Sequence, residues 1–228
     1  MIRASERRKA LNIKDVDWSL YAILDEEWRR GRDIRDLAEA AIRGGVTVLQ
    51  YRNKSDDSGP FFEKADALSK TTKQRHIPLI INDRTDIALA VDADGVHVGQ
   101  DDLPVPKVRQ LIGPEKIIGL SVSHPDELAR VDTADYLGVG SAYPTDSKAD
   151  VHLGGIHLFR TIRKMTDLPI VGIGGINKDN LAPVIQCGCE GVSLISAIFG
   201  KTDVEHAASE LRTAIDQART MEEKESTC

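Results

Sequence analysis

Two apolar runs near the middle of the chain each lead into acidic side chains. The run 79–81 is followed directly by Asn82 and Asp83, and the run 96–98 is followed within a few residues by Asp102. If both runs are parallel strands of one sheet, their acids lie together at its carboxyl edge. A carboxylate there needs water, a metal or a partner charge, and Mg²⁺ held by one or two carboxylates shares itself with substrate phosphates. The sequence therefore predicts Asp83 and Asp102 as metal ligands and Mg²⁺ as the cofactor.

Basic and hydroxyl side chains follow two other apolar runs, 46–51 and 136–140. These side chains are Arg52, Lys54, Thr145, Ser147 and Lys148. Three cations, two hydroxyls and a divalent metal exceed what a single phosphate requires, and together they match a diphosphate. We therefore predict a diphosphate site around the metal.

A second anion site is predicted closer to the C-terminus. Gly174 and Gly175 precede Asn177 at an expected helix start, and Ile195 and Ser196 precede another. Backbone N–H groups at helix N-termini bind phosphate, and barrels commonly place such a site after strands 7 and 8. Glycine favours this use because it lets the phosphate approach the amides. Two phosphorylated ligands, one of them a diphosphate, would then face each other.

Eight β-like runs recur along the chain, at residues 20–24, 46–51, 79–82, 95–98, 117–122, 136–140, 170–174 and 191–195. Helices are predicted after the cap Asp33, from Pro60, and over residues 84–91, 105–112, 125–131, 153–165, 177–187 and 203–220. This alternation predicts an α/β fold, a single (β/α)8 TIM barrel, whereas a doubly wound open sheet usually has fewer strands. We expect a catalytic barrel domain at 18–220, an N-terminal arm or short helix at 1–17, and a frayed tail at 221–228.

Composition argues against several functional classes. The 228 residues carry a net charge of −6 and no basic tract, which makes nucleic-acid binding improbable. No apolar stretch approaches the roughly 20 residues of a membrane span, and the N-terminus lacks the apolar region of a secretory signal. Three cysteines, Cys187, Cys189 and Cys228, are too few and too clustered for a disulfide framework. We expect a cytoplasmic protein with small-molecule substrates and no nucleic-acid or membrane partner, and homo-oligomer formation stays open.

Five segments together resemble one known family. They are QYRNK, INDRTDIALAVDADGVHVGQDD, DYLGVGSAYPTDSK, GIGGI and VSLISAIF. In this order and spacing they resemble the thiamine-phosphate synthase (thiamine-phosphate pyrophosphorylase) family over about residues 20–199. The resemblance implies transfer of hydroxymethylpyrimidine from its diphosphate to a thiazole phosphate, with release of pyrophosphate and use of Mg²⁺.

The resemblance also implies residue roles. Gln50, Arg52 and Lys54 match the family's Q-x-R-x-K group, which holds the pyrimidine and the diphosphate, while Asp83 and Asp102 match its metal ligands. Further diphosphate contacts implied are Asn82, Ser121, Thr145, Ser147 and Lys148. The thiazole-phosphate contacts implied are Gly175, Ile195 and Ser196, beside Gly174. The expected catalytic residues, which would act on the departing diphosphate, are Arg52, Lys54, Ser121 and Lys148.

Two residues depart from the family pattern. The family often has leucine and glutamate where this chain has Tyr51 and Asn53. Successive side chains on a strand point to opposite faces, so both should point away from the ligand. We therefore expect the chemistry to survive these changes.

Some of the site residues have structural alternatives. Asp83 could cap a helix that begins at Arg84. Asp101 is the more structural member of its pair, so Asp102 is preferred as the ligand. His97 lies inside an apolar strand, where it is either a satisfied core histidine or a contact to the pyrimidine.

The mechanism implied is a dissociative substitution. Loss of diphosphate leaves a pyrimidine-methyl cation, which the thiazole nitrogen captures. The closest alternative is an isomerase on the same barrel, similar to the thiazole tautomerases, with His124 as acid and base. A non-catalytic thiamine-precursor binding protein is the third hypothesis.

Overall fold

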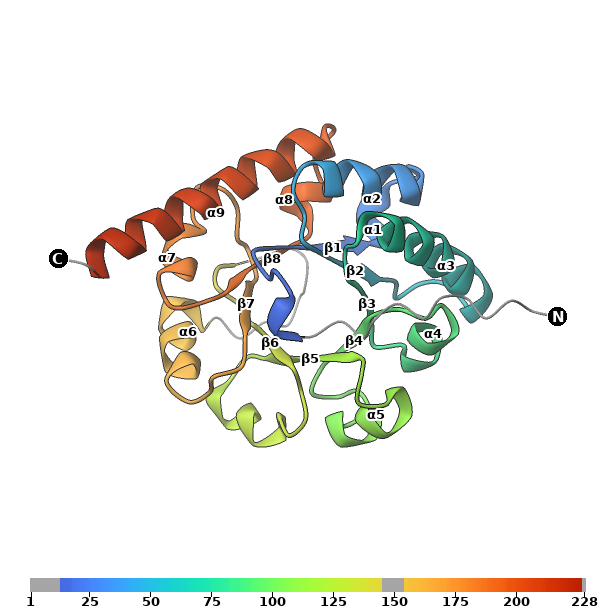
Figure 1. Cartoon of the computed structure of the whole chain (residues 1–228), viewed down its shortest axis with the longest axis horizontal. Coiled ribbons are helices and arrows are strands. Elements are labelled where there is room, and N and C mark those ends of the chain that lie inside the picture. Colours follow the sequence, from blue (N-terminus) through green and yellow to red (C-terminus); the bar gives the residue numbers. More distant parts are fainter. Residues whose placement is uncertain (1–12, 145–153, 227–228) are drawn as a thin grey trace.

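Short apolar runs form the strands of a closed parallel barrel in the computed structural model, which describes residues 13–144 and 154–226, with side chains as far as Met221. The strands follow one another round the ring in chain order (Figure 1). They are β1 Leu20–Asp25, β2 Val48–Arg52, β3 Leu79–Asn82, β4 Gly95–Val98, β5 Ile117–Val122, β6 Tyr136–Val139, β7 Ile170–Ile173 and β8 Gly191–Leu194. The predicted (β/α)8 fold is confirmed.

Alternation along the strands creates two apolar cores. Inward residues such as Ile80, Ile117 and Val171 form a cluster inside the barrel. Outward residues pack against the surrounding helices in a second, larger cluster. Trp18, just before β1, belongs to the inner cluster and stacks on Tyr136, with ring centroids 4.4 Å apart. The segment before β1 thus fills one end of the barrel, and the residues at the other end are left to form a site.

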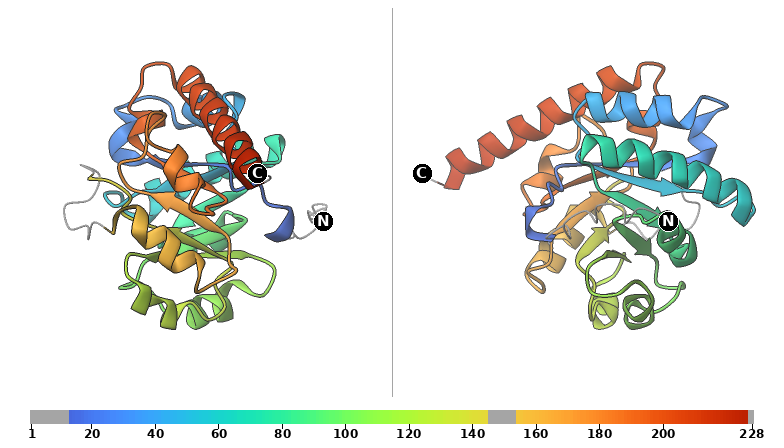
Figure 2. Two further views of the ribbon diagram at one scale, coloured as in Figure 1. Left: turned by 90° about the vertical axis from the view of Figure 1, so that its left-hand side faces the viewer. Right: turned by 45° about the vertical axis from the view of Figure 1, so that its right-hand side comes forward.

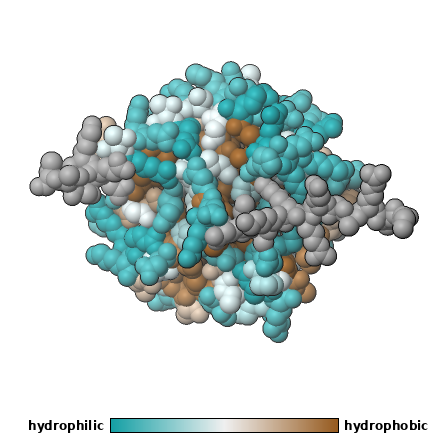
Figure 3. Space-filling view, in the orientation of Figure 1, coloured by the Kyte–Doolittle hydropathy of each residue, from teal (hydrophilic) through white to brown (hydrophobic). Residues whose placement is uncertain are grey.

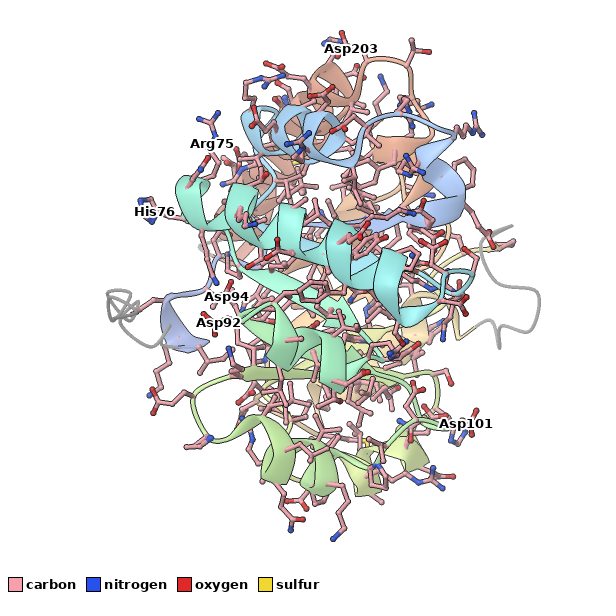
Figure 4. All side chains as sticks on the ribbon, turned by 90° about the vertical axis from the view of Figure 1, so that its right-hand side faces the viewer. Arg75, His76, Asp92, Asp94, Asp101 and Asp203 are labelled. Carbon is pink, nitrogen blue, oxygen red and sulfur yellow. The ribbon has the colours of Figure 1, made fainter. Side chains whose placement is uncertain are left out.

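The two ends of the barrel can be told apart by the residues that flank β4. Asp92 and Asp94 precede this strand and Asp101 follows it, and they lie at opposite ends of the molecule (Figure 4). The end with Asp92 and Asp94 also carries the 3-10 turn η1, Ile13–Asp15, which lies over the ring in Figure 1. Hydrophilic side chains cover most of that face, with smaller hydrophobic patches between them (Figure 3). The opposite, carboxyl-terminal face is where barrel enzymes place their active sites.

Helices surround the barrel. They are α1 Glu26–Arg29, α2 Ile34–Arg43, α3 Ser58–Arg75, α4 Thr85–Ala90, α5 Val105–Ile112, the 3-10 helix η2 Pro125–Arg130, α6 Gly155–Arg163, α7 Ala182–Ile185, α8 Ser196–Phe199 and α9 Val204–Ser226. The Asp33 side chain caps α2 as predicted, accepting from the N–H groups of Arg35 at 2.8 Å and Asp36 at 3.2 Å. No helix in the described ranges has the length and apolar character needed to cross a bilayer.

Two predicted helices and the predicted frayed tail differ from the structure. The segment after Pro125 forms a 3-10 helix, η2, rather than an α-helix. The helix expected from Asn177 begins only at Ala182, because the Asn180 side chain accepts from the Asn177 N–H at 2.7 Å and holds the backbone in a turn. The frayed tail expected from Met221 is instead helical as far as Ser226, in a segment rich in glutamate and lysine, which favour helix (Figure 2).

Candidate active site

Asp83, Lys54 and Asp102 come together where β2, β3 and β4 end. Asp83 follows β3 in the left-handed region, with φ of 58°, and its carboxylate accepts a hydrogen bond from Lys54 Nζ. Burial raises the pKa of Asp83, Lys54 opposes this rise, and a hydrogen bond with Asp102 raises the pKa further. The N-terminal cap residue of α4 is Arg84, and its side chain makes no cap bond. Asp83 is therefore part of a charged cluster, and the structure does not support the capping alternative.

Asp102 closes the turn after β4. Its Oδ2 accepts a hydrogen bond from the Gly99 N–H at 2.7 Å, which leaves its other oxygen to face Asp83 or a ligand. Among the described residues no group of three or more His, Cys, Asp or Glu side chains is arranged to hold a metal. Two adjacent carboxylates fit a hard cation that takes its remaining ligands from water and substrate oxygens. The donor set thus suits Mg²⁺ and does not suit a metal that prefers sulfur or imidazole ligands.

Arg52, at the end of β2, is held by an acid that the sequence analysis missed. Arg52 Nη1 donates to Oδ2 of Asp25, its register partner on β1. The other oxygen, Asp25 Oδ1, accepts from the Glu27 N–H at 2.9 Å and caps α1. The Asp25 side chain is 4% exposed and that of Arg52 19% exposed. The signal was available, since Asp25 directly follows the apolar run 20–24 in the sequence.

The two departures from the family pattern lie on the helix side of β2. Tyr51 belongs to the outer core and packs edge-on against Phe61, with centroids 5.1 Å apart. Its hydroxyl donates to Glu26 Oε2 at 3.0 Å and accepts from Asn53 Nδ2 at 3.0 Å. Neither side chain is directed into the barrel, as the strand alternation predicted.

Polar side chains inside the barrel include three of the predicted substrate contacts. Gln50 Nε2 donates to the Tyr21 hydroxyl at 2.8 Å. His97 hydrogen-bonds Tyr136 through Nδ1 and Ser121 through Nε2, both at 2.9 Å. The hydrogen bonds favour the first of the two alternatives for His97, a satisfied core histidine, and its contact to the pyrimidine stays a prediction. Asn82 is its register partner at the end of β3.

The predicted phosphate turn is shaped by close packing. Gly174 and Gly175 have φ of 98° and 61°, and a side chain on either would overlap Ser141 or Tyr143. Their carbonyl oxygens are tied back, Gly174 O accepting from Tyr143 N and Gly175 O from Asn180 Nδ2, both at 3.0 Å. These two hydrogen bonds fix the conformation of the turn at the carboxyl end of β7.

The helix starts expected around this turn are only partly present. α8 begins at Ser196 with Ile195 as its cap residue, and it is a single short turn. No helix begins at Asn177. The predicted contacts Thr145, Ser147 and Lys148 lie outside the described residues.

The fold and the residues at the carboxyl-terminal face of the barrel together define a class of protein. It is a (β/α)8 barrel with paired carboxylates and cations at the carboxyl ends of β1 to β4 and a turn of two left-handed glycines after β7. β3 and β7 lie across the ring from each other, so the charged cluster and the glycine turn face each other across the barrel mouth (Figure 1).

Sequence and structure comparisons give the family. The sequence profile described as thiamine monophosphate synthase matches residues 20–198. A thiamine-phosphate synthase from Moorella thermoacetica is 47% identical over 205 residues, covering 89% of this chain and 98% of that protein. One from Alkaliphilus oremlandii is 45% identical over 202 residues, covering 88% and 97%. The solved thiamine phosphate pyrophosphorylase from Pyrococcus furiosus superposes with a TM-score of 0.81 at 36% identity, covering 89% and 98%. The chain belongs to the thiamine monophosphate synthase family, and it is an enzyme of the transferase class.

Proposed function

We propose that this enzyme joins hydroxymethylpyrimidine diphosphate to thiazole phosphate, giving thiamine monophosphate and pyrophosphate with Mg²⁺ as cofactor. The observation that carries the proposal is the cluster of Asp83, Asp102 and Lys54. Two carboxylates beside a cation would hold a divalent ion and a diphosphate together. Family membership supports the same reaction.

The reaction breaks one bond and forms another. The C–O bond between the pyrimidine methylene and the diphosphate breaks, and the diphosphate leaves with the electron pair. The lone pair of the thiazole nitrogen then forms the new C–N bond to the methylene cation. Bound Mg²⁺ would neutralise part of the charge on the diphosphate.

The chain's own residues would stabilise and orient this step. Arg52 and Lys54, with Lys148 and Ser121, would contact the departing diphosphate, and Gln50 would hold the pyrimidine ring. The Gly174–Gly175 turn, with Ile195 and Ser196, would anchor the thiazole phosphate so that its nitrogen faces the cation. Asn82 and the hydroxyls of Thr145 and Ser147 would complete the diphosphate contacts. No covalent nucleophile is needed.

The isomerase alternative requires a catalytic role for His124. His124 Nδ1 instead accepts from the Asp126 N–H at 3.3 Å in the capping box of η2. Its side chain is 57% exposed and lies 3.3 Å from the Asp126 carboxylate. A solvated capping histidine is a poor acid–base catalyst for a buried carbon centre, so the synthase is favoured.

Incubation with both phosphorylated substrates tests the proposal. We expect pyrophosphate and thiamine phosphate to form together, only when Mg²⁺ is present. Conversion of a thiazole tautomer alone would support the isomerase, and binding of both ligands without release of pyrophosphate would support the non-catalytic binding protein. The cytoplasmic location stays a prediction, and the oligomeric state stays open.

A further inference from the structure

Five polar side chains form one continuous hydrogen-bonded chain through the barrel interior. Gln50 on β2 bonds Tyr21 on β1 at 2.8 Å, and Tyr21 bonds Tyr136 on β6 at 2.7 Å. Tyr136 bonds His97 on β4, and His97 bonds Ser121 on β5, both at 2.9 Å. The two ends, Gln50 and Ser121, are proposed substrate contacts, whereas the two tyrosines between them have no role in the reaction described above.

Neighbouring residues of the barrel pack closely against this hydrogen-bonded chain of side chains. A Cβ atom on Gly119 would overlap both Tyr136 and His97, and one on Gly138 would lie 2.9 Å from His97 Cε1. Trp18 stacks on the ring of Tyr136 from the closed end. Two glycines and an aromatic plug therefore hold the phenol and the imidazole in place. A buried polar chain is stable only when every member is satisfied.

The hydrogen bonds between these five side chains all run the same way from donor to acceptor, because each phenol has a single proton to donate. Burial raises the pKa of Tyr21 and of Tyr136 above the ordinary value, so both stay protonated. Tyr21 accepts from Gln50 Nε2, and we assign its own proton to the bond with Tyr136 because that oxygen is its other hydrogen-bond partner. With this assignment the Tyr136 proton goes to His97 Nδ1, and His97 carries its own proton on Nε2, facing Ser121.

We propose that Tyr21 and Tyr136 are positioning residues that fix the Nε2–H tautomer of His97 and thereby make Ser121 a hydrogen-bond donor toward the diphosphate. The Ser121 oxygen accepts from His97, so its own proton points elsewhere, and Ser121 lies half-buried at the carboxyl end of β5. At the other end, Gln50 has one amide N–H engaged by Tyr21 and keeps its carbonyl for the pyrimidine. This inference rests on the proposed function for what the two ends contact.

If the Gln50 amide were turned round, every bond in the chain would reverse. His97 would then carry its proton on Nδ1, and Ser121 would donate to His97 instead of to the substrate. The tautomer of one histidine therefore reports the direction of the whole chain.

The test is ¹⁵N NMR of the histidine ring nitrogens in the substrate-free protein, with the His97 signals assigned by their loss in His97→Asn. We expect a protonated Nε2 and an unprotonated Nδ1. In Tyr136→Phe, which removes the donor to Nδ1, we expect a mixture of tautomers and a kcat lowered about tenfold, because only part of the enzyme then presents the Ser121 proton to the diphosphate. The KM for thiazole phosphate should not change.

Tyr51→Phe is the matched control, because it deletes a buried phenol hydroxyl on the outer side of β2. It should leave the His97 tautomer and kcat as in the unmodified enzyme. In Tyr21→Phe, Tyr136 can still donate to His97, so we expect the tautomer to persist while the KM for the pyrimidine diphosphate rises.

A protonated Nδ1 in the unmodified protein overturns the inference, as does a Tyr136→Phe enzyme with unchanged tautomer and kcat. If Tyr136→Phe does not fold, the tautomer of the unmodified protein and the KM of Tyr21→Phe decide the question. The NMR measurement needs no substrate. An unmodified enzyme that shows the expected tautomer but releases no pyrophosphate would therefore contradict the proposed function alone.

Discussion

Replacing Asp25 would separate two interactions that one side chain makes. Asp25 Oδ2 accepts from Arg52, and Asp25 Oδ1 caps α1 through the Glu27 N–H. Asp25→Ala removes both interactions. Asp25→Asn keeps the cap, because asparagine caps helices as well as aspartate does, but it removes the charge that faces Arg52.

The cost follows from the burial of the pair. Removing one partner of a fully buried ion pair costs about 3–5 kcal/mol, and the partial exposure of Arg52 reduces this to about 2–3 kcal/mol. Loss of a helix cap adds about 1 kcal/mol. We therefore expect Asp25→Asn to lower the free energy of unfolding by about 2–3 kcal/mol and Asp25→Ala by about 3–4 kcal/mol. For a chain of this size the larger loss lowers Tm by about 10 °C.

Urea unfolding of matched variants measures these losses in the free energy of unfolding. Asp33 caps α2 through the N–H groups of Arg35 and Asp36 and is far more exposed, so Asp33→Ala should show only the cap loss of about 1 kcal/mol. The difference between Asp25→Ala and Asp33→Ala then isolates the contribution of Arg52. Turnover should also fall by about 10²-fold in Asp25→Asn, because Arg52 loses the partner that orients it. Equal destabilisation by Asp25→Ala and Asp33→Ala would refute the reasoning.

Three further predictions concern the metal site, the phosphate turn and the segment before β1. Asparagine tolerates the left-handed backbone at position 83, so the Asp83→Asn variant should fold. We expect it to lose the rise in Tm that Mg²⁺ with pyrophosphate gives the unmodified protein. An unchanged rise would remove Asp83 from the proposed metal site. Gly175→Ala should lower the free energy of unfolding by at least about 1–2 kcal/mol through backbone strain. It should also raise the KM for thiazole phosphate more than the KM for the pyrimidine diphosphate. Equal changes in the two KM values would contradict the assignment of the turn. Burial raises the pKa of Asp17, but hydrogen bonds from Ser19 and Arg212 outweigh it and leave that pKa below its ordinary value. Asp17 therefore stabilises the fold at pH values above its unfolded-state pKa, and this stability is lost as the pH falls through its folded-state pKa. Near neutral pH, Asp17→Asn should unfold at a lower urea concentration than the unmodified protein. In acid the two proteins should unfold at the same urea concentration.

Strand positions and the pairing of Asp83 with Asp102 could be predicted because they depend on local pattern. The carboxyl ends of neighbouring parallel strands must meet, so Asp83 and Asp102 could be placed together from sequence alone. Helix ends were harder. At Asn177 the side chain of Asn180 competes with helical hydrogen bonding, and that outcome depends on a turn that no periodicity reveals.

The pairing of Arg52 with Asp25 and the interior chain required the register of the closed barrel. Asp25 reads equally well as the first acid of a helix, and only the alignment of β1 with β2 sets it opposite Arg52. Tyr21 and Tyr136 are 115 positions apart in sequence, and their hydroxyls meet only because the sheet closes on itself. Closure is a property of the whole sheet, so contacts across the barrel cannot be derived from one segment at a time.

The two described cations of the site differ in how firmly they are held. Arg52 is mostly buried and tied to an acid that is itself almost fully buried, whereas the Lys54 side chain is 52% exposed and its partner Asp83 is a proposed metal ligand. An oxygen of Asp83 that coordinates a divalent ion is a weaker acceptor for Lys54, while nothing comparable competes for Asp25. A diphosphate would therefore meet one fixed cation and one that is released toward it when the metal site fills. This difference predicts that Lys54→Arg, which restricts the side chain, impairs turnover more than binding of inorganic pyrophosphate with Mg²⁺. Equal loss of turnover and of pyrophosphate affinity would show that Lys54 acts only as a fixed charge.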